Sequence, residues 1–534
     1  MCNNILFFGT VMPISLKLPQ IDNNPILLAE TRPPKIKTFI QNLPLNEPIR
    51  AANNLIEELR IINSQQVSVA NRLNALELYR PVGLSIYQRL LPQFSHARLP
   101  ISKKEQEFAL ASSQLWQEFA LGYKSALVDF QNKILSINSV KITALIIQRA
   151  IHACSEIALI NHLAYTTPPA VLWAELHQLY YIALQQSADL VTVNDDNATN
   201  KLSSASIIYT QTLLLALVNP QHLANKDTLI ASKYLANVCS HAQLRPLGFI
   251  ASPAGVFLVS LDSNNPPIPF VKNKAIPDNA TDILLVTLNL ARLIHRHIKL
   301  LQDKILPDGD CMPENAIEIH FIDLLKHLIK QFGKTPQRVF SRVKKSEGIE
   351  LGIGIDAAHH LLAKNKREFD KLPIDIEINI DKNNLFKISR WHILNVSAGG
   401  YALRKFNSSV ANAQIGDLVT VKNNRTNACE LAVLRWANFN EIQQLDVGLE
   451  LISPGVSTAI VKTKGTFPGT QALLLPELLT LKQAASIIAP VGVLKIGQPI
   501  QMHANDKHTN IMPTQLIERT ASYERYQYCL ILSD

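Results

Sequence analysis

The hydrophobic pattern of this chain changes its period near Gly333, and that change restricts the folds open to it. From about residue 45 to 245 the apolar residues recur at helical spacing, so that Phe108, Leu115 and Phe119 fall on one helix face. After Gly333 short apolar runs are separated by Gly, Asn or Asp, as strands and turns are. Because the two patterns occupy separate parts of the chain, we predict a multidomain α+β protein.

The length and composition are those of several folded domains. The 534 residues are 47% hydrophobic and 18% charged, so about two to four units could each bury a core. The net charge of +9 is not gathered in a basic stripe, and we expect no nucleic-acid partner. No helical stretch offers about 20 residues without charge, and the six cysteines show no paired spacing. We therefore predict a soluble, cytoplasmic protein with reduced thiols and no membrane insertion.

Breaks in the pattern divide the chain into four segments. We expect an N-terminal extension over 1–44, then an all-α helical domain over 45–333, either a bundle or an irregular stack of helix pairs. A β-hairpin is expected inside that domain, near 247–261. A small β-barrel is predicted over 334–455, and a second small β-barrel-like domain over 456–534.

Individual elements follow from the period and from the turn residues. The hairpin would pair Leu247–Ile250 with Val256–Leu261, and helices would follow at about 281–303 and 315–332. Seven runs predict the first barrel: Ile349–Ile355, Ile376–Ile380, Leu385–Leu394, Tyr401–Lys405, Leu418–Lys422, Leu431–Trp436 and Val447–Ile452. The second β domain is expected from Ala472–Leu475, Val493–Ile496, Ile500–His503, Leu516–Glu518 and the alternating run 526–532.

A small polar corner, from Asn395 to Gly400, interrupts one of these strand-like runs. The Asn395 amide and the Ser397 hydroxyl offer short hydrogen-bonding groups, and Gly400 has no Cβ to block a close approach. Upstream, Arg338 and Arg342 form an RxxxR motif. A corner of this kind is a place where a β-barrel can present side chains to a ligand.

With both motifs, the region 334–455 resembles the PilZ domain, a six-stranded barrel that binds the bacterial second messenger cyclic di-GMP. That family uses RxxxR and [D/N]xSxxG, and the later runs Ile415–Asp417, Val433–Trp436 and Asp446–Leu449 follow the order of its strands. The resemblance covers roughly a quarter of the chain. RxxxR alone is common, whereas the ordered pair of motifs is much more specific.

The resemblance implies a role for each motif residue. Arg338 and Arg342 would clamp the ligand, because a guanidinium group can pair with phosphate or guanine and can also stack on the base. Asn395, Ser397 and Gly400 would surround one guanine. Lys344 and Lys345 add positive charge nearby, but they belong to neither motif.

The gap between the two motifs is longer than in most PilZ domains, which indicates an insertion at about 363–385. An alternative alignment takes Arg367 and Lys371 as a degenerate RxxxK motif. We prefer Arg338 and Arg342, because the run Ile349–Ile355 supplies the strand expected after the arginines.

Other motifs point to structure rather than to chemistry. Gly352–Ala357 matches GxGxxA, but no βαβ pattern surrounds it, so we interpret it as barrel strand. Adjacent His359 and His360 in a strand would point to opposite faces, and we expect no metal site. Trp391 and Trp436 could stack on a guanine, but barrel core is the simpler interpretation. With no GxSxG, P-loop or kinase motif, we expect no enzyme activity.

We therefore expect a bacterial cyclic di-GMP receptor that needs no cofactor and couples ligand binding at the barrel to a helical domain with a protein partner. One alternative is an assembly or adaptor protein that uses the barrels only as scaffold. A weak RNA binder is a third, based only on the pI of about 9.1 and the aromatic residues of the barrels. The sequence leaves the oligomeric state open.

Overall fold

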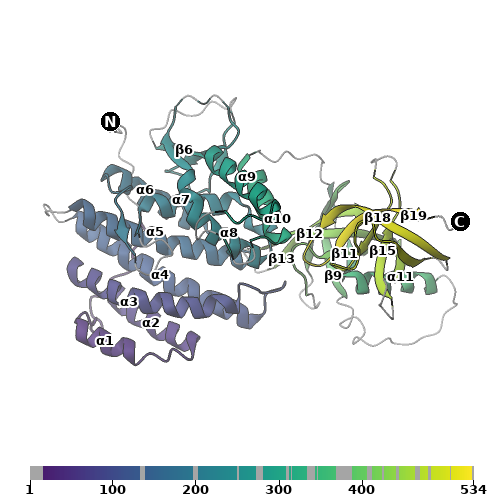
Figure 1. Ribbon diagram of the computed structural model, residues 1–534. Coiled ribbons are helices and arrows are strands. Elements are labelled where there is room, and N and C mark those ends of the chain that lie inside the picture. Colours follow the sequence, from purple (N-terminus) through teal and green to yellow (C-terminus); the bar gives the residue numbers. More distant parts are fainter. Residues whose placement is uncertain are drawn as a thin grey trace. The chain divides into compact units, whose positions relative to one another are not determined.

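The computed structural model has two compact units (Figure 1). The first, called the helical unit here, comprises Met1–Ala97, Ile101–Pro220 and Asn225–Pro336; the second, the barrel unit, comprises Arg98–Pro100, Gln221–Ala224 and Gln337–Asp534. The structure describes residues 16–132, 139–195, 202–248, 250, 252–271, 281–307, 312–313, 316–333, 343–345, 347–368, 388–405, 412–423, 426–440, 444–462, 469–478, 483–504 and 507–531.

The helical unit confirms the predicted all-α region. Its first eight described α-helices are α1 Pro33–Gln41, α2 Pro48–Asn63, α3 Val69–Leu90, α4 Lys103–Gln131, α5 Ser139–Leu163, α6 Ala170–Gln185, α7 Ala205–Leu217 and α8 Asn225–Val238. The start of α4 shows why the sequence folds this way, because Ser102 and Glu105 form a reciprocal capping box. Helices begin before residue 45: Ile36 of α1 is fully buried, and Phe39 meets Tyr79 of α3 edge to face.

Helices α4 and α5 form the centre of this unit and pack against each other along their length. Glycine lets α3 approach α4 closely, since a Cβ on Gly83 would lie 2.7 Å from the Phe119 ring. Among the described helices, Val140–Leu163 is long and apolar enough to cross a membrane, with a mean hydropathy of 1.3. Of the most apolar stretch of this helix, 72% is buried inside the structure. The apolar character of the helix is therefore explained by its packing in the core.

A small four-stranded sheet and two helices complete the helical unit. The strands β3 Gln243–Pro246, β4 Val256–Ser260, β5 Ile268–Pro269 and β6 Asp282–Val286 lie in the order β3-β6-β4-β5. Helices α9 Leu288–Gln302 and α10 Ile319–Gly333 follow and pack together. The Thr287 hydroxyl, between β6 and α9, donates to the carbonyls of Gly255 and Phe332 and so joins the sheet to α10.

Two predictions in this region are wrong. The hairpin over 247–261 does not form, because β4 pairs with β6 and β5, and β3 lies just before Leu247 and pairs with β6. The helix predicted over 281–303 starts only at Leu288, because its first residues form strand β6. A short apolar run suits a buried strand as well as a buried helix, and here two flanking strands bury it.

The first barrel lies in the barrel unit and has six strands. They are β8 Gly348–Ile353, β9 Ile388–Ser397, β10 Gly400–Lys405, β11 Leu418–Asn423, β12 Cys429–Phe439 and β13 Leu445–Ser453. The order β10-β13-β12-β11-β8-β9 is closed by pairing of β9 with β10, and the short β7, Val343–Lys344, pairs with the end of β9. This confirms the predicted barrel; the run Ile376–Ile380 lies outside the described residues.

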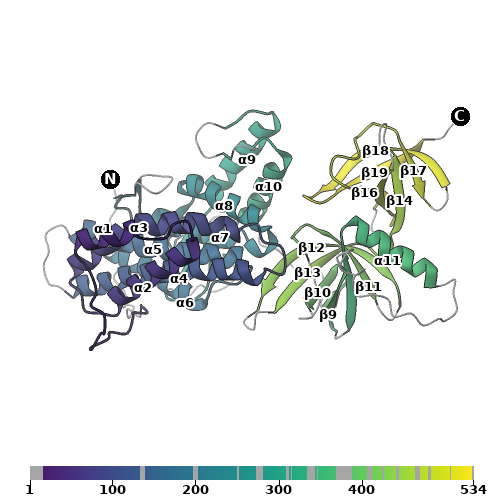
Figure 2. The same cartoon turned by 90° about the horizontal axis from the view of Figure 1, so that it is seen from below.

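Helix α11, Ile355–Glu368, was not predicted. The strand expected over Ile349–Ile355 ends at Ile353, and Gly354, with a positive φ of 88°, turns the chain into the helix. His359 and His360 therefore lie on a helix and not on a strand. Helix α11 packs on β8 and β11 of the first barrel and on β14 and β15 of the second (Figure 2).

The second predicted β domain is also a closed barrel. Its strands are β14 Ser457–Lys462, β15 Thr470–Leu475, β16 Ser486–Ala489, β17 Ile500–Ala504, β18 Lys507–Arg519 and β19 Glu524–Ile531, in the order β14-β15-β16-β19-β18-β17. The prediction of a strand at Val493–Ile496 is wrong. This run lies among turns, with Gly492 and Gly497 at positive φ on either side.

Candidate functional site

The polar corner predicted from the sequence is the turn between β9 and β10. Ser397 ends β9 and is paired with Gly400, which begins β10. On its other side Gly400 is paired with Glu450 of β13, and the Leu451 amide donates to the Gly399 carbonyl at 2.9 Å. The corner is therefore held from both sides by strands of the same barrel.

Only glycine fits at position 400. Its φ is +148°, and a Cβ built there would lie 1.9 Å from the carbonyl oxygen of Leu449. The close contact is with backbone, which cannot rotate away as a side chain could. The glycine of the motif thus allows β10 to lie directly on β13.

Asn395 and Ser397 are half-buried residues at the end of β9, next to the turn. The pairing of β9 with β10 shifts between Ala402 and Leu403, which face Asn395 and Ile393. Leu394 is thus an extra residue, and a bulge of this kind bends the strand and re-aims the side chains beyond it. The Ser397 hydroxyl makes a long contact of 3.5 Å with the Gly400 carbonyl.

Arg338 and Arg342 lie outside the described residues. The described chain resumes at Val343, directly after Arg342, and this strand, β7, runs antiparallel to the end of β9. Val343 is paired with Val396 and Lys344 with Asn395. The residues that follow the RxxxR motif therefore lie beside the strand that carries the NxSxxG motif.

Cationic side chains are frequent on the strands next to the corner. Lys344 and Lys345 are exposed, and Lys345 pairs with Glu347 at 3.1 Å. On β10, Arg404 forms a bidentate pair with Asp446 at 2.6 and 2.7 Å, and this hydrogen bonding raises the pKa of Arg404 above its usual value. Burial lowers the pKa of the neighbouring Lys405.

The two tryptophans of the barrel have structural positions. Trp391 is 2% exposed and donates to the Ser389 hydroxyl, as expected for a core residue. Trp436 is half-buried and covers Gly448, where a Cβ would lie 1.7 Å from the indole nitrogen. Both indole rings therefore have packing roles inside the barrel, as the sequence interpretation expected.

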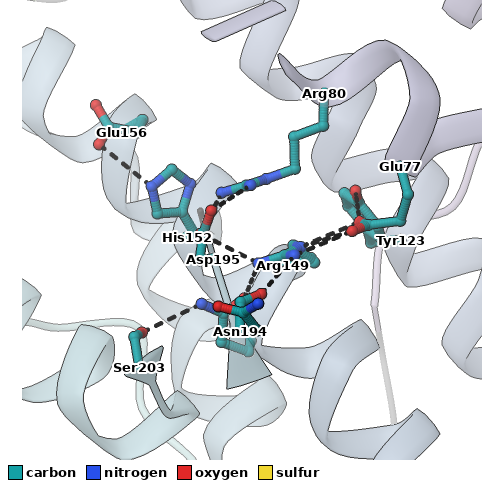
Figure 3. Close-up of polar contacts among 10 residues, drawn as sticks. Glu77, Arg80, Tyr123, Arg149, His152, Glu156, Asn194, Asp195 and Ser203 are labelled. Atoms are coloured by element: carbon teal, nitrogen blue, oxygen red, sulfur yellow. Dashed lines mark hydrogen bonds and ion pairs between the residues drawn. The ribbon is translucent and has the colours of Figure 1, made fainter. Parts of the chain in front are cut away.

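The helical unit contains a buried network of charged residues that the sequence did not reveal (Figure 3). Arg80 pairs with both carboxylate oxygens of Asp195 at 2.8 and 2.7 Å. Arg149 joins Asp195 at 3.1 Å to Glu77 at 3.0 Å, and the Tyr123 hydroxyl also donates to Glu77. Each charged side chain in the network is paired with an opposite charge. The network therefore joins α3, α4 and α5 and has a structural role.

Next to this network, burial changes the pKa of two residues of α5. Burial lowers the pKa of His152 to about 3, so this side chain is neutral near neutral pH, and burial raises the pKa of Glu156 to about 7, which favours its protonated form below that pH. Their nearest approach is 3.8 Å. Within the described part of the chain, no group of three or more His, Cys, Asp or Glu side chains could hold a metal ion.

A six-stranded barrel with an NxSxxG corner, joined here to a helical unit and to a second barrel, defines a PilZ-type protein of three parts. Three family models match consecutive stretches of the chain: Cyclic-di-GMP receptor FimW, N-terminal domain, at 34–247; Cyclic-di-GMP receptor FimW, middle PilZ domain, at 256–377 and 375–457; and FimW C-terminal beta-barrel domain at 456–531. The chain belongs to this family of PilZ-domain proteins.

A relative from Pseudomonas aeruginosa, described as Cyclic-di-GMP receptor FimW, is 23% identical over 578 aligned residues. The alignment covers 96% of this chain and 93% of that relative, so the two proteins share all three parts. No solved structure matches the chain. The PilZ resemblance and the predicted order of a helical domain and two barrels are thus confirmed.

Proposed function

We propose that this protein is a cyclic di-GMP receptor whose site is formed by Arg338, Arg342, Asn395, Ser397 and Gly400. One observation carries the proposal: the two residues of β7, which follow Arg342 directly, are paired with Val396 and Asn395. This pairing brings the described end of the RxxxR segment next to the NxSxxG corner. The name of the Pseudomonas aeruginosa relative supports the identity of the ligand.

The same pairing favours Arg338 and Arg342 over the alternative alignment. Arg367 lies near the end of α11, a helix that packs between the two barrels on β8, β11, β14 and β15. Lys371 lies outside the described residues. No described strand pairing links either of these residues to β9, whereas β7 is paired with it directly.

The chemistry of the proposed site suits this ligand. Cyclic di-GMP has two phosphates and two guanines, and arginine can serve both, by bidentate pairing and by stacking. Asn395 and Ser397 supply a donor and acceptors of the size needed at a base edge. Lys344 and Lys345 add positive charge, which favours an anionic ligand. We propose binding without catalysis, and a cytoplasmic location where this messenger is made.

We further propose that the helical unit is the output part, which binds a protein partner. Residues 334–342, which carry both arginines, connect α10 to β7, so ligand contacts there would act on the connection itself. The rival function, an adaptor with the barrels as scaffold, needs no ligand at all.

Calorimetric titration of the full chain with cyclic di-GMP tests the proposal. We expect saturable binding that is lost in Arg342→Ala and in Ser397→Ala. Arg292→Ala is the matched control, since Arg292 belongs to a second RxxxR sequence on the exposed side of α9 and its loss should leave binding unchanged. Absence of binding by a wild-type chain with native circular dichroism would overturn the proposal in favour of the adaptor.

A further inference from the structure

One hydrophobic cluster spans the two barrels, beside a separate cluster inside the second barrel. Ile355 and Ala358 of α11 and Leu431 of β12 are buried in the same cluster as residues of the second barrel. The members from the second barrel are Leu473, Leu475, Ile488 and Tyr523. Burial of apolar area on both sides stabilises this contact and joins the second barrel to the first.

Polar contacts cross the same interface. His359 of α11 contacts the Ala472 carbonyl of β15 at 2.8 Å, and the Ser522 hydroxyl donates to the Gly416 carbonyl at 3.3 Å. One cation also bridges the barrels: Arg435 of β12 donates to Glu450 of β13 at 2.5 Å and to Glu518 of β18 at 2.6 Å. The buried Tyr523 hydroxyl donates to the other oxygen of Glu518 at 2.8 Å.

Strand irregularities put both ends of this bridge in place. The pairing of β12 with β13 shifts between Leu434 and Trp436, so Arg435 is the extra residue of a bulge. The pairing of β18 with β19 shifts just before Glu518. Bulges re-aim side chains, and these two aim an arginine and a glutamate at each other across the interface.

The bridge reaches the proposed ligand corner through Glu450. Glu450 is the residue of β13 paired with Gly400, and the next amide along β13, that of Leu451, donates to Gly399. Any displacement of this part of β13 would displace the corner, because Gly400 lies directly on the β13 backbone. This part of β13 is thus joined to the second barrel by the Arg435 bridge, while Ile452, further along β13, joins it through the shared apolar cluster.

We infer that Arg435 is a positioning residue for the ligand site: it holds β13 behind Gly400 against the C-terminal barrel, so cyclic di-GMP binding depends on that barrel. This inference rests on the proposed function. Coupling between two binding equilibria is reciprocal. If the Arg435 contacts raise the affinity for the ligand, bound ligand must in turn stabilise the Arg435 contacts. The effect of ligand should therefore be measurable in β18, well away from the corner residues in sequence.

Two measurements on the full chain test this inference: calorimetric affinity for cyclic di-GMP, and hydrogen exchange of residues 518–523 with and without it. We expect Arg435→Met to weaken binding about tenfold and Glu518→Gln to do about the same. The double variant should be no weaker than the worse single variant, because both changes cut one connection. Ligand should slow exchange at 518–523 in the wild type but not in Arg435→Met.

Arg519→Met is the matched control. The Arg519 side chain is 30% exposed, close to the 36% of Arg435, and pairs with Glu524 at 2.9 Å, but this pair lies within the second barrel. The affinity of Arg519→Met for cyclic di-GMP should lie within about twofold of that of the wild type, and ligand should still slow hydrogen exchange at 518–523. If the wild type binds while Arg435→Met and Glu518→Gln behave like this control, the inference is overturned and the proposed function stands. If the wild type does not bind cyclic di-GMP, both the inference and the proposed function are overturned. If Arg435→Met does not fold, Glu518→Gln decides.

Discussion

Gly400→Ala tests how strictly the corner depends on backbone contact. The added Cβ would begin 1.9 Å from the Leu449 carbonyl oxygen, and this distance must grow to about 3.2 Å, so β10 or β13 must move by more than about 1 Å. A non-glycine residue at φ +148° costs about 1–3 kcal/mol. Weakening the Leu451 to Gly399 hydrogen bond adds about 1 kcal/mol. We expect a local destabilisation of about 3 kcal/mol.

Hydrogen exchange in β10 and β13 measures this loss directly, because the local opening free energy falls with the stability of the strand pair. We expect the amide of Leu451 to exchange about a hundredfold faster in Gly400→Ala, and calorimetry to show lost cyclic di-GMP binding. Gly348→Ala is the control in the same barrel, since a Cβ there meets nothing within 4 Å. Its effect should stay within about 1 kcal/mol. Equal exchange rates in the two variants would refute the reasoning.

Two further predictions concern the helical unit. Asp195→Asn leaves Arg80 and Arg149 partly uncompensated in the core, and we expect chemical denaturation to show a loss of about 3–5 kcal/mol. Asp323→Asn, which breaks an exposed pair, should cost under about 1 kcal/mol, and equal effects would contradict this account. Burial lowers the pKa of His162 to about 4, so the neutral form is favoured in the fold. Its contribution of up to about 3 kcal/mol is complete above pH 6.5 and is lost as the pH falls toward 4, so His162→Gln should flatten the decline of unfolding free energy with acidification.

The parts predicted correctly from the sequence are those set by neighbouring residues. The turn could be found because Asn395, Ser397 and Gly400 lie within six residues of one another, at the junction of two consecutive strands. The same is true of α10, which ends at Gly333, one residue beyond the predicted end at 332. Short-range patterns of this kind carry their own structural information.

The errors and omissions have a common physical cause, which is dependence on distant partners. Strand β6 is a strand because β3 and β4 lie on either side of it, and its own sequence does not distinguish this from a helix start. Asp195 meets Arg80 across 115 positions of sequence, and Arg435 meets Glu518 across 83. No local pattern announces such pairs, since their spacing is set by the tertiary fold.

This difference also decides which residues can distinguish a receptor from a scaffold. Gly400 is required by the barrel itself, because β13 leaves no room for a Cβ, so a barrel without ligand would need it equally. Ser397 is different: it is half-buried, and its only described side-chain contact is a long one to the Gly400 carbonyl. Loss of its hydroxyl should leave the fold intact. Loss of binding in Ser397→Ala with unchanged exchange in β9 and β10 would therefore identify a ligand contact, whereas the same loss in Gly400→Ala would not.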